Sequence, residues 1–274
     1  MRRIKGQGSR VKGQDYLFLA SYLLLLTVFL FSCSDDPATH AYQKADELLS
    51  KGQYEKAIKA YKNIVEKYQE SIVASQAQYK IGQIHQLYLH DDNQAIKSYE
   101  VLMLMYPYSK EVISARKDMA EIYTRQGIYQ KAITEYQWLI RNSRSVEREK
   151  FHYEIAMCYL KMSDATQARI ELQELVKNSP STELAPKIHY QIANTFYIEG
   201  KLKDAIKAYD NFINNYPDDM LAIEARFNKA VCLEETDNLK DALALYRAVA
   251  DKYTNKDAVQ ERISGIEARM RQGR

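Results

Sequence analysis

Residues 52–61 read GQYEKAIKAY, and residues 127–136 read GIYQKAITEY. Each stretch has an alanine in its sixth position and a tyrosine one helical turn later. The alanine recurs at intervals of 36 to 38 residues, at Ala57, Ala95, Ala132, Ala168, Ala205 and Ala242. A bulky residue follows each alanine by four positions, in the order Tyr61, Tyr99, Tyr136, Leu172, Tyr209 and Tyr246. A constant period of this length indicates an array of helical hairpins.

A small residue also precedes each alanine by about twelve positions, at Ala45, Gly82, Ala120, Ala156, Ala193 and Ala230. Two facing small residues let the helices of a hairpin pack closely, and the bulky residue fills the space toward the next hairpin. The sequence therefore predicts an all-α solenoid of six helical hairpins over residues 40–255. Turns are expected at Gly52, 90–92, Gly127, 163–164, Gly200 and 237–238, where Gly, Asp, Asn or Ser tolerates left-handed geometry or caps a helix.

The C-terminal segment, residues 256–274, is expected to form a capping helix. Its apolar residues Val259, Ile263, Ile266 and Met270 are spaced 4, 3 and 4 apart, which places them in one stripe of a helix. The other positions of the segment are largely charged or polar. Such a helix can bury the open end of the last hairpin and present a polar surface to solvent.

The charge distribution argues against nucleic acid as a main partner. Residues 1–32 carry five basic residues and one acidic residue, a net of +4, which leaves −1 for the rest of a chain whose formal net charge is +3. A phosphate backbone is bound through a concentrated positive field, and the part beyond residue 32 has none by composition.

The N-terminus has the pattern of an export signal, residues 1–32. A basic stretch precedes an apolar run from Tyr16 to Phe31, which is shorter than the roughly 20 residues of a spanning helix. The following LFSC, residues 30–33, resembles the lipobox of bacterial lipoproteins. That resemblance implies cleavage before Cys33, lipidation of its thiol, and a flexible leader at residues 33–39. Serine at position 34, in place of aspartate, implies transfer to the outer membrane. The alternative is an uncleaved signal anchor in the inner membrane, with the remaining residues again facing the periplasm.

The two quoted stretches resemble the turn and second helix of a tetratricopeptide repeat, although the usual period is 34 residues. Tyr106-Pro107 and Tyr216-Pro217, near the ends of second helices, are similar to one subgroup of these proteins. It includes the BamD-like lipoproteins of outer-membrane β-barrel assembly and the periplasmic cell-division coordinators. BamD-like proteins usually have five repeats, whereas six are counted here. The resemblance implies a scaffold for envelope proteins; a coordinator, a pilus-assembly lipoprotein and a signal-anchored periplasmic chaperone remain alternatives.

The first helices are expected to line a partner-binding groove. The position that commonly faces the groove in tetratricopeptide proteins holds Tyr42, Tyr79, Lys117, Tyr153, Tyr190 and Phe227, which we call the ladder. Rigid aromatic side chains with a polar tip anchor peptides well. Residues beside the ladder are expected to add selectivity: Asn194, Tyr197, Lys187, Lys150, Glu121 and Arg125. Acidic Glu224, Glu234 and Glu235 follow in the sixth hairpin. Alternatively, the tyrosines only support neighbouring helices.

The remaining chemistry-bearing residues predict neither an enzyme nor a metal site, and no cofactor is expected. No phosphate-binding glycine loop, nucleophile elbow, His-Glu-x-x-His or Cys-x-x-Cys motif occurs. His85 and His90 fall on different helix faces, and His152 and His189 occupy equivalent repeat positions typical of packing. Cys158 and Cys232 are two hairpins apart, beyond the reach of a disulfide, and are expected to be buried free thiols.

Overall fold

The computed structural model describes residues 36–142 and 144–272. Within those ranges it contains thirteen helices and no strand. The helices are α2 (Pro37–Ser50), α3 (Tyr54–Lys67), α4 (Ile72–Leu87), α5 (Asp92–Met105), α6 (Glu111–Arg125), α7 (Tyr129–Asn142), α8 (Ser145–Lys161), α9 (Ala165–Asn178), α10 (Ala185–Ile198), α11 (Leu202–Asn215), α12 (Leu221–Glu235), α13 (Leu239–Val249) and α14 (Lys256–Gln272). The expected signal and Cys33 lie outside the described residues. None of the described helices has the length and apolar content needed to cross a bilayer.

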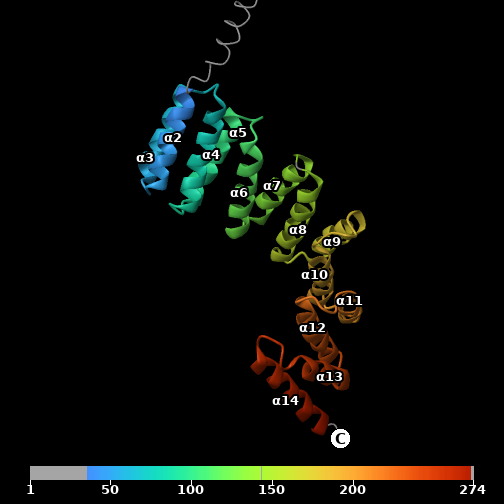
Figure 1. Ribbon diagram of the computed structural model, residues 1–274. Helices are drawn as coiled ribbons and strands as arrows, with labels where there is room; N and C mark the ends of the chain where they lie inside the picture. The colour runs from blue at the N-terminus through green and yellow to red at the C-terminus, as the bar shows by residue number, and fades with distance from the viewer. Residues whose placement is uncertain (1–35, 143, 273–274) are drawn as a thin grey trace, which may run out of the picture. The chain divides into compact units, whose positions relative to one another are not determined.

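Consecutive helices pair into six hairpins, α2–α3 through α12–α13, as Figure 1 shows. Each hairpin turn has one residue with a positive φ: Gly52 (70°), His90 (52°), Gly127 (75°), Ser163 (63°), Gly200 (70°) and Asp237 (61°). A residue with left-handed backbone geometry ends one helix and turns the chain into the next helix. The six-hairpin, all-α fold and the positions of its turns are confirmed.

The first helix begins at Pro37, three residues before the expected start near His40. The Asp36 carboxylate accepts hydrogen bonds from the backbone N–H groups of Ala38 and Thr39, at 3.2 and 3.3 Å. Proline suits the first turn of a helix because its missing N–H would have no partner within the helix. Residues 37–39 are therefore helical, and the expected flexible leader cannot extend to residue 39.

Small residues bring the two helices of each hairpin together. The six recurring alanines, and the alanines that pair with them in the first helices, are all fully buried. In the second hairpin, where Gly82 takes the place of alanine, a Cβ atom would overlap the ring of Tyr99. The bulky residues four positions after the alanines are also buried, Tyr136 being the most exposed at 5%. Their packing confirms the role predicted from the spacing.

The chain divides into two compact units, Met1–Leu102 and Met103–Arg274, which we call unit 1 and unit 2. The boundary lies within α5. The described part of unit 1 has its core between α2, α3 and α4, where Tyr61, Ile64 and Ile84 are buried. Unit 2 contains the third to sixth hairpins and α14. Each unit presents its own first helices as a candidate surface.

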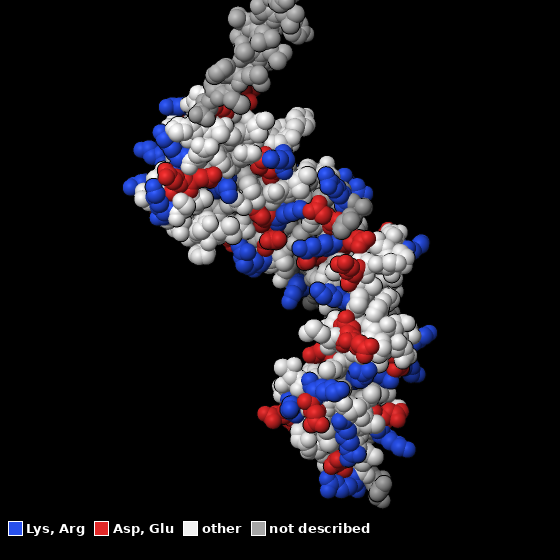
Figure 2. Space-filling view, viewed as in Figure 1, with Lys and Arg blue, Asp and Glu red and all other residues white. Residues whose placement is uncertain are grey.

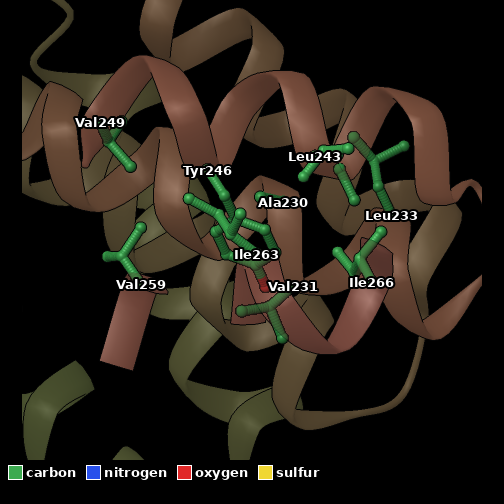
Figure 3. Close-up of a cluster of buried hydrophobic side chains, with 10 residues drawn as sticks. Ala230, Val231, Leu233, Leu243, Tyr246, Val249, Val259, Ile263 and Ile266 are labelled. Atoms are coloured by element: carbon green, nitrogen blue, oxygen red, sulfur yellow. The ribbon is translucent and has the colours of Figure 1, made fainter. Parts of the chain in front are cut away.

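Helix α14 caps the last hairpin, as the apolar stripe predicts. Val259, Ile263 and Ile266 are buried against residues of α12 and α13, including Leu243 and Tyr246; Figure 3 shows these side chains converging from three helices. Charged pairs surround the contact: Arg262 lies 3.1 Å from Glu234, Arg247 lies 2.6 Å from Glu267, and Arg269 lies 3.0 Å from Asp237.

Candidate functional site

In unit 1 the ladder residues Tyr42 and Tyr79 are half-buried. Tyr42 packs edge-on against Tyr61, with ring centroids 5.4 Å apart, and Tyr79 lies 5.7 Å from Tyr99. Tyr79 Oη also accepts a hydrogen bond of 3.2 Å from Gln83. Each ladder ring therefore rests on the bulky residue of its own hairpin while part of its surface remains accessible.

In unit 2 the ladder begins with Lys117 on α6. Its Nζ lies 2.5 Å from Oε1 of Glu147 and 5.5 Å from the ring centroid of Phe151, both on α8. The lysine thus joins two successive first helices. Contacts of a cation with a carboxylate and with a ring face both stabilise the fold. Their contribution to the free energy of folding is modest here, because the ion pair is partly exposed to solvent.

Tyr153 and Tyr190 also connect successive first helices. Asn228 of α12 donates a 3.0 Å hydrogen bond to Tyr190 Oη, and Gln191 of α10 donates one to Tyr153. The Tyr190 ring packs against Phe212, with centroids 5.8 Å apart. Burial raises the pKa of both phenols, so they remain protonated near neutral pH. These two ladder residues have structural contacts in addition to any role in binding.

The other residues expected in the groove differ in availability. Asn194 accepts a 2.6 Å hydrogen bond from Tyr209 Oη and donates one of 3.0 Å to Gln191, so both ends of its amide are engaged internally. Tyr197 is 37% exposed and donates a 3.0 Å hydrogen bond to Glu235. At the last ladder position, the ring of Phe227 stacks on the ring of Tyr253, with ring centroids 4.2 Å apart. Of these three, Tyr197 offers the most surface to a partner.

A cavity of about 350 Å³ in unit 2 opens between α6 and α8. Its lining residues are Lys117, Glu121, Thr124, Arg125, Tyr136, Glu147, Lys150, Phe151 and Glu154. Four of them, Lys117, Glu121, Arg125 and Lys150, were expected beside or within the ladder. We call this space the α6–α8 cavity. Figure 2 shows acidic and basic side chains interspersed over the visible face of the molecule.

The electrostatics of the cavity centre on Glu154. Burial raises the pKa of this carboxyl group, the negative charge of Glu121 adds to the increase, and the positive charges of Lys150 and Lys187 oppose it. Burial therefore changes the pKa of Glu154 more than the neighbouring cations do. Sequence reasoning missed Glu154 and the rings of Tyr136 and Phe151, because their convergence depends on contacts between successive hairpins. The 37-residue period, applied to facing positions of neighbouring first helices, is the signal that could have found Glu154 and Phe151, whereas Tyr136 lies on the second helix α7.

Both described cysteines are buried free thiols, as expected. Burial raises the pKa of Cys158, and it raises that of Cys232 to about 12. Among the histidines, His189 packs against Tyr216 with ring centroids 5.7 Å apart, which agrees with a packing role. Within the described residues, no three His, Cys, Asp or Glu side chains are arranged to hold a metal ion.

The model of the family described as soluble NSF attachment protein, SNAP, matches residues 22–190, more than half of the chain. The chain belongs to this family. A second family model, described as tetratricopeptide repeat, matches residues 190–257. Together the two matches cover all six hairpins and identify this SNAP-family chain as a tetratricopeptide-type protein-interaction scaffold. No curated protein matches the chain.

Solved structures share the fold of this SNAP-family chain at low sequence identity. A tetratricopeptide repeat protein from Parabacteroides merdae has a TM-score of 0.52 and 13% identity, covering 84% of this chain and 98% of its own. YrrB, described as a TPR protein with an unusual peptide-binding site, has a TM-score of 0.53 and 15% identity, covering 74% and 96%. The structure of Naa15/Naa10 bound to HypK-THB has a TM-score of 0.62 and 16% identity, covering 90% of this chain and 36% of that one. At these identities the likeness establishes the fold.

Proposed function

We propose that this chain is a lipid-anchored scaffold on the periplasmic face of the outer membrane. In this proposal it binds envelope proteins through the first helices of unit 2 and supports the assembly of outer-membrane β-barrel proteins. The lipid anchor at Cys33 and the location are inferred from the N-terminal pattern, and the assembly role from the BamD-like resemblance. No catalytic step is part of the proposal.

The observation that carries the binding role is the α6–α8 cavity. It combines two well-buried rings, Tyr136 and Phe151, with charged groups of both signs within one opening of about 350 Å³. Concave sites with apolar walls and a few placed polar groups are the usual form of a binding site. An acyl chain at Cys33 would hold this surface at the membrane and raise its effective concentration toward a membrane-bound partner.

The binding role can be tested by photo-crosslinking in intact cells. A photoreactive amino acid replaces Thr124 or Lys150 in the cavity wall, and in a matched control it replaces Ile170 of α9, which is 48% exposed and does not line the cavity. The expected result is a defined adduct with a β-barrel assembly protein from positions 124 and 150. Equal adducts from position 170, or none from the cavity wall, would overturn the groove as the binding surface.

The anchor is tested separately by labelling with an alkyne fatty acid. Incorporation into the full chain, its loss in Cys33→Ser, and sedimentation with outer-membrane vesicles are the expected results. Unprocessed protein in the inner membrane would replace the lipoprotein proposal with the signal-anchor alternative. Adducts with pilus or cell-division proteins in the crosslinking experiment would replace the β-barrel assembly role while keeping the binding surface.

A further inference from the structure

The most exposed large apolar side chains of the described residues all lie beside connections between hairpins. Ile72 is 77% exposed, Leu104 82% and Met220 91%, and Tyr108 is fully exposed. Ile72 begins α4, Leu104 and Tyr108 flank the end of α5, and Met220 directly precedes α12. At the turns within hairpins, the most exposed described apolar side chain is Ile198, at 56%. The edge that carries the connections therefore bears apolar side chains that the fold does not cover.

The end of α5 bears the largest concentration of these side chains. Leu104, Met105 and Tyr108 are all exposed, and we call them the α5-end patch. Residues 101–110 read VLMLMYPYSK, with no acidic residue and a single basic one, Lys110. The solvent-facing surface of a helix in a soluble protein is normally charged or polar. A contiguous exposed apolar patch is typical of an interface with a protein or a membrane.

The edge of unit 1 that carries these connections is also the edge at which the chain enters the fold. Helices α2 and α4 begin at the same end of unit 1, as Figure 1 shows. Helix α5 runs back along α4 toward this edge, and its residues up to Leu102 belong to unit 1. Asp36, which caps α2, is three residues from Cys33, a distance of at most about 11 Å in an extended chain. A membrane tether that ends at Cys33 therefore holds this edge close to the bilayer.

The area and the chemistry of the patch favour a lipid surface over a second copy of the chain. Its side chains expose a few hundred Å² together, whereas a typical stable interface takes about 800 Å² from each partner. Tyrosine suits the membrane boundary because its ring is apolar and its hydroxyl group can stay in contact with water. The side chain of Lys110, 4.0 Å from Glu111, is 78% exposed and can approach anionic headgroups.

We infer that the α5-end patch, and separately Ile72, lie in the headgroup boundary of the membrane that holds the N-terminus. This inference rests on the proposed membrane tether and adds a second contact, which determines the edge of the chain that faces the bilayer. It holds for a lipid at Cys33 and for an uncleaved signal anchor, because both end at nearly the same residue. A second copy of the chain is the competing occupant.

The test is fluorescence quenching by brominated lipids. An environment-sensitive fluorescent amino acid replaces Leu104 or Tyr108, and in the matched control it replaces Ile198, at a turn within a hairpin. The full chain is purified from its membranes and reconstituted in vesicles of phosphatidylethanolamine and phosphatidylglycerol with bromine on the acyl chains near the headgroup. We expect quenching at positions 104 and 108 to be several-fold stronger than at 198. Equal quenching at all three positions, or stronger quenching at 198, would overturn the inference.

A second measurement shows whether the native side chains make the contact. The fluorescent amino acid is placed at Met105, and quenching is compared between the native background and the double variant Leu104→Ser, Tyr108→Ser. We expect a several-fold loss of quenching, whereas the control double variant Met162→Ser, Ile198→Ser should leave quenching unchanged. Circular dichroism checks that all variants fold. Equal quenching in the two double variants would contradict the assignment.

The outcomes separate this inference from the proposed function. If Cys33 incorporates the fatty acid and the cavity wall crosslinks while positions 104 and 108 stay unquenched, the proposed function stands and the membrane contact is wrong. Quenching at 104 and 108 without fatty-acid incorporation would support the contact with a signal anchor in place of the lipid. A dimer in sedimentation velocity that the Leu104→Ser, Tyr108→Ser variant dissociates, together with no quenching, would assign the patch to a second copy and overturn the inference.

Discussion

Asn228 of α12 donates a hydrogen bond of 3.0 Å to the hydroxyl of Tyr190 on α10, so a residue expected to bind partners also joins two successive hairpins. Tyr153 is linked in the same way to Gln191. Residues 38 positions apart therefore meet in polar contacts between the first helices. Substitutions in the ladder must be judged for stability as well as for binding.

We expect Tyr190→Phe to lower the free energy of unfolding by about 1 kcal/mol, the usual contribution of one hydrogen bond. Tyr190→Ala should cost about 3 kcal/mol, because it also removes the ring that packs against Phe212. Chemical denaturation followed by circular dichroism measures both. If Tyr190→Ala leaves stability unchanged while weakening binding, the residue acts as a partner anchor and its structural contacts are unimportant.

Gly82→Ala is expected to destabilise unit 1 by about 1–3 kcal/mol, since the new methyl group overlaps the buried Tyr99 ring. Moving that ring would also disturb the 2.8 Å hydrogen bond from Tyr99 to Gln86. Gly265→Ala is the matched control, because nothing lies within 4 Å of a Cβ there. On the exposed surface of α14 it should stabilise by about 0.5–1 kcal/mol. Thermal melts of the two variants should shift in opposite directions; a shared direction would refute the packing argument.

Ser163→Gly should stabilise the fourth hairpin by about 1 kcal/mol. Its φ of 63° is unfavourable for a residue with a Cβ atom, and glycine adopts it without strain. Gly127→Ala, at a φ of 75° in the third hairpin, should destabilise by a similar amount. Denaturation midpoints of the two variants provide the check. A loss of stability in Ser163→Gly would mean that backbone freedom in the unfolded chain outweighs strain at this turn.

Glu199 should make stability depend on acid pH. Hydrogen bonds from Arg169, then Lys201 and Thr166, hold the pKa of its carboxyl group at about 2, below the ordinary value of 4.5. A lowered folded-state pKa contributes stability that is present above pH 4.5 and lost as the pH falls toward 2. The melting temperature of Glu199→Gln should therefore be lower than that of the unmodified protein at pH 6. The difference should shrink below pH 4.5. A difference that stays constant down to pH 3 would argue against this carboxylate as the source.

The hairpins could be predicted because their contacts repeat at one period. Ala57 and Ala242 occupy equivalent places, so one spacing rule located every turn. Helix α2 begins before the predicted start near His40, because the Asp36 cap and Pro37 lie ahead of the repeat pattern. The hydrogen bond that Tyr209 donates to Asn194 could not be predicted, because it depends on how α10 packs against α11. The environment of Glu154 could not be predicted for a similar reason. Its like-charged neighbour Glu121 lies on another hairpin, 33 positions earlier in the sequence.

The stacking of Tyr253 on Phe227 also affects how such an array can grow by duplication. This ring pair covers the end of the last hairpin, where the chain turns toward α14. A hairpin copied between α11 and α12 would add one ladder residue and leave this ring contact unchanged. A copy added after α13 would separate Phe227 from Tyr253 and remove the packing of α14 against α12 and α13. Lengthening in this lineage should therefore be internal, with the terminal hairpin and its cap inherited as one piece.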